Sequence, residues 1–210
     1  MDVLFGSSPA FAGLSTLAAL SFVLAAFGFI PYIIDTLAGR TQPARASWLI
    51  WSTLSLIAFS TQMVEGTAAS LWFVGTQCGF TVFIFLLSIT RGSGAFFSRA
   101  NLMIFAAAAA GLLVWYSLSS AIYALGVVIA ISALGGYATV VKAFAGPRSE
   151  TLSTWVLQAA ASLCGLLAVE RLELVVVAYP AFLLALYVAI VLAICLGRRR
   201  AVAPDLGVVA

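Results

Sequence analysis

Long apolar stretches alternate with short polar breaks along almost the whole chain. Charged residues, glycines and prolines mark the breaks, and most of the stretches between them have the roughly 20 residues that a helix needs to cross a bilayer. Seven segments result, at residues 11–38, 46–64, 68–90, 101–117, 119–144, 152–169 and 173–196. We therefore expect an all-α polytopic membrane protein with seven transmembrane helices.

The boundary between the fourth and fifth segments carries the least signal, because the stretch from Tyr116 to Ser120 has no charge. One long kinked helix there would give six spans, but it would be about twice as long as a bilayer requires. Two helices joined by a tight turn are the better interpretation.

Basic residues follow the same division. Nine of the ten fall in alternate loops on one side, and Arg171 alone falls on the other. The nine are Arg40, Arg45, Arg91, Arg99, Lys142, Arg148 and Arg198 to Arg200. Because loops rich in Lys and Arg stay in the cytoplasm, this bias predicts an outside N-terminus and a cytoplasmic C-terminus. Opposite locations of the two termini require an odd number of helices.

Composition supports a bilayer as the solvent of this protein. Of 210 residues, 64% are hydrophobic and 8% charged, with a mean hydropathy of +1.17, which is more apolar surface than one soluble core can hide. The net charge of +3 is explained by orientation, so no nucleic-acid partner is expected. The first ten residues contain Asp2 and no Lys or Arg, which is unlike a secretory signal peptide.

The residue types give no indication of a metal or cofactor site. Histidine is absent, and Cys78, Cys164 and Cys195 lie in separate apolar segments without a paired spacing. We expect no cofactor, no metal and no disulfide framework. An enzyme is also disfavoured, because no paired central carboxylates and no Ser or Cys beside a base can be identified.

A sequence pattern occurs twice. Each copy has a tyrosine near a helix end, a short basic loop with Gly and Pro, and a hydroxyl residue before a tryptophan. The copies run from Tyr32 to Trp48 and from Tyr137 to Trp155, and the second loop is two residues longer in this alignment. The repetition predicts two three-helix units of the same orientation, which need one helix between them. The expected divisions are 1–90, a linker loop and helix at 91–118, 119–197, and a cytoplasmic tail at 198–210.

In this layout the chain resembles the PQ-loop and SWEET (MtN3) superfamily. The resemblance is carried by Pro31-Tyr32 and by the basic loops followed by Ser47-Trp48 and Thr154-Trp155. The chain departs from the family in having Gln42-Pro43 instead of the proline–glutamine dipeptide, and a single asparagine, Asn101, instead of the SWEET asparagine pair. The resemblance implies a three-plus-one-plus-three bundle that moves a small neutral or weakly polar solute by alternating access. KDEL receptors belong to the same superfamily, so a non-transporting receptor or assembly subunit is the alternative.

Polar residues inside apolar helices indicate where a ligand site would lie. Ser47, Trp51 and Ser55 stand four apart on one helix, and Thr154, Gln158 and Ser162 repeat the spacing 107 residues later. With Gln77 and Tyr179, we expect Trp51 and Gln158 to line a midplane pocket for the solute. Such residues also join membrane helices by roughly 1 kcal/mol per hydrogen bond. That role is favoured for Ser55 and Ser162, while both roles stay open for Gln77 and Gln158.

Four further residues are candidates for coupling or gating: Pro31, Asp35, Trp48 and Trp155. Asp35 is the only carboxylate inside a predicted span, and Pro31 frees a backbone carbonyl nearby, so Asp35 is a candidate proton or cation site. The alternative is a solvated carboxylate paired with Arg40, whose counterpart in the second unit is Val140. The two tryptophans stand at the cytoplasmic boundary, where interfacial anchoring is favoured, although each also caps the expected gate.

These predictions define the expected setting of the protein. We expect an integral protein of a plasma membrane, most simply a bacterial inner membrane. Its partners would be the lipid bilayer and a small-molecule solute. Assembly into a homo-oligomer stays open.

Overall fold

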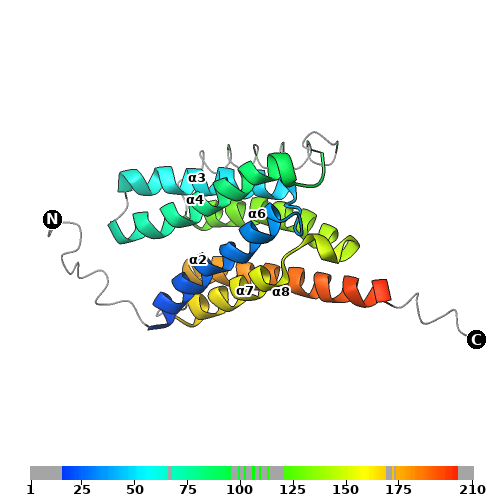
Figure 1. The fold of residues 1–210 in the computed structure, drawn as a ribbon. Coiled ribbons are helices and arrows are strands. Elements are labelled where there is room, and N and C mark those ends of the chain that lie inside the picture. The colour runs from blue at the N-terminus through cyan, green and yellow to red at the C-terminus, as the bar shows by residue number, and fades with distance from the viewer. Residues whose placement is uncertain are drawn as a thin grey trace, which may run out of the picture.

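The computed structural model describes residues 16–65, 68–95, 121–168 and 174–202, together with positions 99, 102, 106, 109, 113 and 172. Within these residues the chain is all-helical and has no β-strand, as predicted (Figure 1). The elements are α2 (Thr16–Leu37), α3 (Arg45–Glu65), α4 (Ala68–Arg91), α6 (Ala121–Ala145), the 3-10 turn η1 (Pro147–Ser149), α7 (Leu152–Leu167) and α8 (Leu174–Val202).

Most helix ends fall within a few residues of the predicted segments. The helix α8 is the exception, because it continues beyond residue 196 through Arg198 to Arg200. Cations are favourable in the last turn of a helix, and the Arg200 guanidinium lies 5.8 Å from the centre of the Phe144 ring. Most of the expected linking helix, 101–117, lies outside the described residues, although positions 102, 106, 109 and 113 are helical.

Three described stretches are long and apolar enough to cross a membrane: Ala19–Leu37, Gly126–Ala145 and Val177–Ala201. At 1.5 Å per residue they are about 28 to 38 Å long, comparable with the hydrocarbon core of a bilayer. Two shorter apolar helical stretches cover Gln77–Arg91 and Leu152–Leu167. Large apolar side chains on the outer surface, including Phe27, Ile34 and Leu192, are exposed. These helices are compatible with membrane integration.

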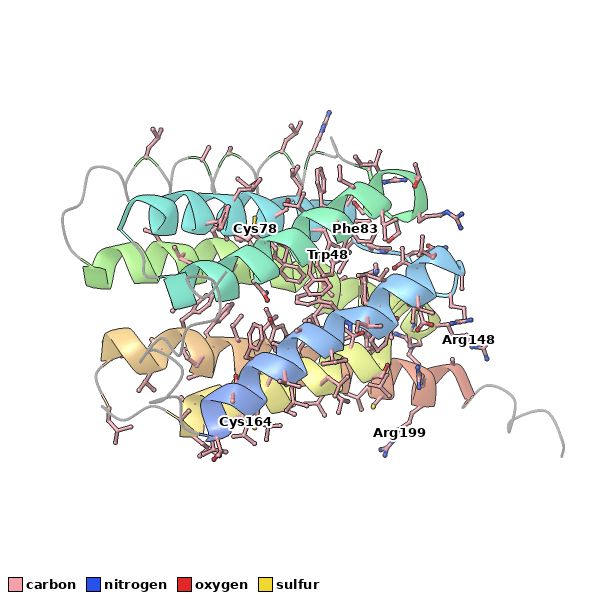
Figure 2. The ribbon with its side chains drawn as sticks, turned by 60° about the vertical axis from the view of Figure 1, so that its left-hand side comes forward. Trp48, Cys78, Phe83, Arg148, Cys164 and Arg199 are labelled. Atoms are coloured by element: carbon pink, nitrogen blue, oxygen red, sulfur yellow. The ribbon has the colours of Figure 1, made fainter. Side chains whose placement is uncertain are left out.

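The helices form two layers (Figures 1 and 2). One layer contains α3, α4 and α6, with α3 contacting both of the others, and the second contains α2, α7 and α8, with α7 contacting both of the others. The layers meet where α6 contacts α8 and where α2 contacts α4. Each layer therefore combines helices from both parts of the chain.

The six α-helices of the described residues each have one terminus at the same end of the bundle, which we call the basic end. Figure 2 shows Arg148 and Arg199 there. Arg45 donates to the carbonyls of Ser88 and Gly94, and Arg91 donates to the carbonyl of Leu37. The guanidinium groups thus bind backbone carbonyls at and just beyond the C-terminal ends of α2 and α4.

Candidate functional site at the basic end

Two loops lie against each other at the basic end, residues 38–44 between α2 and α3 and residues 146–151 between α6 and α7. The amide of Gln42 donates to the carbonyl of Ser149 at 3.0 Å, and the hydroxyls of Thr41 and Thr151 are 2.5 Å apart. Gly39 permits this path because it adopts a φ of 74° just after α2. We call these two loops, joined by hydrogen bonds at the end of the bundle, the cover.

Two ion pairs lie in this cover. Asp35 accepts hydrogen bonds from the Arg40 guanidinium at 2.6 and 2.9 Å and from the Thr151 hydroxyl at 2.9 Å. Lys142 pairs with Glu150 and donates to the carbonyl of Gln42. Both pairs therefore reach the opposite loop, Asp35 through Thr151 and Lys142 through Gln42.

Glu150 is a buried carboxylate. Its side chain is 0% exposed, and Oε2 accepts a hydrogen bond from the Trp155 indole at 2.9 Å. Oε1 has Lys142 as its ion-pair partner but no hydrogen bond of good geometry within the described residues. A carboxylate is costly to bury without such compensation, so Lys142 and Trp155 make this position possible.

Aromatic side chains fill the interior beneath the cover. We call Tyr32, Trp48, Trp51, Trp155 and Tyr187 the aromatic plug. The Trp48 indole donates to the Tyr32 hydroxyl at 3.1 Å. Ring centres are 5.1 Å apart for Tyr32 and Trp48, and 6.2 Å for Trp51 and Trp155. Because Tyr32, Trp48 and Trp155 are at most 2% exposed, the basic end is closed.

Trp48 and Trp155 do not have the exposed rings of interfacial anchors. Anchoring tryptophans lie at the lipid headgroups, whereas these two rings are buried and their indole nitrogens bond to buried oxygens. Their expected part in gating stays a prediction. Pro31 lies inside α2, which continues to Leu37 without a break.

The surroundings of Asp35 match the alternative interpretation, in which the carboxylate is solvated and paired with Arg40. Its side chain is 25% exposed and paired with Arg40, so it is neither isolated nor fully buried. The buried carboxylate is Glu150, which the sequence places in a polar loop. One signal for it was available, because Glu150 stands just before a helix whose N-terminal end favours negative charge.

The four expected pocket residues are only partly brought together. The Trp51 indole donates to the carbonyl of Ser132 at 3.4 Å, and the Tyr179 hydroxyl interacts with the Ser132 side chain. Gln158 instead donates to the carbonyl of Ala25 at 3.0 Å, joining α7 to α2. Gln77 is half-buried on α4. Among the described residues, none forms a hydrogen bond with its side chain.

Hydroxyl groups join helices as expected for structural contacts. The Ser55 and Thr81 hydroxyls are 2.7 Å apart between α3 and α4, which confirms the structural role predicted for Ser55. Ser47 donates to the carbonyl of Gly135 at 2.6 Å and accepts from Thr139 at 2.9 Å, joining α3 to α6. These bonds hold neighbouring helices in register.

The site offers hydrogen bonds, two ion pairs and aromatic surfaces. Within the described residues no three His, Cys, Asp or Glu side chains gather to bind a metal ion. No protein-family model, curated protein or solved structure matches the chain. Its function is therefore inferred from the geometry.

Proposed function

We propose that the protein is a small-solute transporter of the SWEET and PQ-loop type. Seven helices in a three-plus-one-plus-three layout would move a small neutral or weakly polar solute by alternating access of two halves. The first half contains α2, α3 and α4, and the second contains α6, α7 and α8. One observation carries the proposal, namely that each contact between two helices has a counterpart when the two halves are exchanged.

The exchange replaces α2 by α6, α3 by α7 and α4 by α8. The contact between α2 and α7 then becomes that between α6 and α3, and the contact of α3 with α4 becomes that of α7 with α8. The contact of α2 with α4 becomes that of α6 with α8. Each of these contacts is present, as expected for two parallel repeats about an axis along the membrane normal.

Buried positions in one half also correspond to buried positions in the other half. Four pairs of positions 107 residues apart are buried alike: Tyr32 and Thr139, Thr36 and Ala143, Ser47 and Thr154, and Trp48 and Trp155. Gly39 and Gly146, just after α2 and α6, have the same separation. The halves therefore align without a gap across the first loop.

This alignment corrects the one drawn through the tyrosines. Tyr137 is 68% exposed whereas Tyr32 is 0% exposed, so the two are not equivalent. The counterpart of Asp35 becomes Lys142 instead of Val140. Equivalent positions thus carry opposite charges, and each binds the loop of the opposite half.

The contacts at the basic end are those that alternating access would have to break. The two loops belong to different halves, and so do Tyr32 and Trp155, whose rings are 6.0 Å apart. A solute could leave by this end only after the loops and the aromatic plug separate. We assign this end the role of a gate in its closed state, which carries forward the gating role expected for Trp48 and Trp155.

A closed plug is also compatible with a receptor or assembly subunit that never opens. A thermal-shift screen of the purified protein against sugars, nucleosides and vitamin precursors would first identify a ligand. Uptake of that ligand by proteoliposomes, accelerated when the same ligand is preloaded inside, supports transport. Saturable binding without uptake supports the receptor function.

A further inference from the structure

A cleft opens at the surface of the basic end. It has a volume of about 550 Å³, which lies within the range of small-molecule sites. Both loops line it, through Gly39, Arg40 and Gln42 from one half and through Gly146 and Arg148 from the other, and Ala201 of α8 completes the wall. The cleft is thus shared between the halves.

Positive charge dominates this cleft. Arg40 and Arg148 lie on walls from different halves, and both are exposed. The three arginines that precede Ala201 on α8 add to the field. Asp35 is paired with Arg40 and Glu150 with Lys142, so among the described residues the net positive charge beside the cleft comes from Arg148 and from the arginines at the end of α8.

Two groups on the wall of the cleft remain accessible to a ligand, the backbone at Gly39 and one nitrogen of Arg40. Gly39 has a positive φ, and a Cβ there would meet no atom within 4 Å. Arg40 uses Nε and one terminal nitrogen on Asp35, so its other terminal nitrogen lies outside that pair. That remaining nitrogen can still donate a charge-assisted hydrogen bond to a phosphate oxygen.

We propose that this cleft binds a phosphate-bearing anion, the headgroup of an anionic phospholipid. The cleft lies at the ends of the membrane-spanning stretches of α2 and α6, the level at which headgroups lie. Basic clusters at this level attract anionic lipids. The ligand would touch both halves and hold them in the closed arrangement, a consequence that rests on the proposed function, whereas the binding does not.

The test measures how lipids raise the unfolding temperature of the full chain in neutral detergent. Phosphatidylglycerol and phosphatidylcholine are titrated separately, and inorganic phosphate and glycerol 3-phosphate form two further arms. The variant is Arg148→Gln, which removes an exposed charge from the cleft. Its matched control is Arg99→Gln, which removes an exposed charge that does not line the cleft.

We expect phosphatidylglycerol to stabilise the wild type and phosphatidylcholine to have little effect. Arg148→Gln should weaken the apparent affinity about fivefold, the effect of one basic side chain at a membrane surface, while Arg99→Gln leaves it unchanged. Stabilisation by either soluble phosphate, lost in Arg148→Gln, would keep the anion site but overturn the lipid as its source. Equal effects of both lipids, or equal losses in both variants, would overturn the site.

Discussion

The buried ion pair of Lys142 and Glu150 gives the sharpest test of the packing at the basic end. Lys142→Met leaves the Glu150 carboxylate buried beside the Trp155 indole without its cation. Removing one partner of a buried pair costs about 3–5 kcal/mol. Glu150→Gln keeps an acceptor for the indole, and Lys142 is 17% exposed and still donates to Gln42, so we expect a loss of about 1–2 kcal/mol.

The double variant Lys142→Met/Glu150→Gln buries no charge at this position. It should therefore be more stable than Lys142→Met alone, with a coupling energy between the two positions of about 2 kcal/mol. The assay is reversible unfolding in mixed detergent micelles, followed by tryptophan fluorescence, for all four proteins. Additive losses, or a larger loss in Glu150→Gln than in Lys142→Met, would refute a pair whose energetics are set by the buried carboxylate.

Three further substitutions test the packing and the coupling residue. Gly28→Leu should destabilise the folded protein by about 1–3 kcal/mol, because a Cβ at position 28 would lie 3.1 Å from a side-chain nitrogen of α7. Gly126→Leu should not destabilise it, because the space around Gly126 is open. Denaturant unfolding measures both variants. Tyr32→Phe removes the acceptor of a buried indole N–H, so it should lower the free energy of unfolding by about 1–2 kcal/mol. Tyr137→Phe changes an exposed position and should unfold like the wild type. Asp35→Asn alters a partly exposed pair, so it should cost less than about 1 kcal/mol. Its uptake of the ligand found by the screen should respond to an imposed proton gradient as uptake by the wild type does. A response that is present in the wild type and lost in the variant would restore Asp35 as the coupling site.

The helices of this protein are predictable from sequence because their apolar segments are as long as a bilayer would require, and because most of these segments end at charged or glycine-containing breaks. The end of α8 was missed for the same reason. Arg198 to Arg200 end the apolar segment, but the helical hydrogen bonds continue to Val202. Hydropathy reports where a helix leaves the hydrocarbon, and it does not report where the helix ends.

The candidate site was harder to predict, because burial at the ends of helices depends on contacts between distant loops. Glu150 stands in a polar loop by sequence and becomes buried because the loop of the other half folds against its own. Trp48 stands where anchoring tryptophans also stand, and its packing against rings such as Tyr32 and Trp51 places it in the core. Tyr137 matched Tyr32 in residue type, but burial matches at a separation of 107 residues instead.

The central claim is that the two halves separate at the basic end during transport, and a reversible crosslink between Thr41 and Thr151 tests it most directly. Their hydroxyls are 2.5 Å apart across the halves, so cysteines at both positions should form a disulfide. The double variant is built with the three native cysteines replaced by alanine, and each single variant serves as a control. We predict that oxidation abolishes uptake of the ligand found by the screen, that a reductant restores it, and that oxidant leaves the single variants unaffected. Undiminished uptake by fully crosslinked protein would contradict the account.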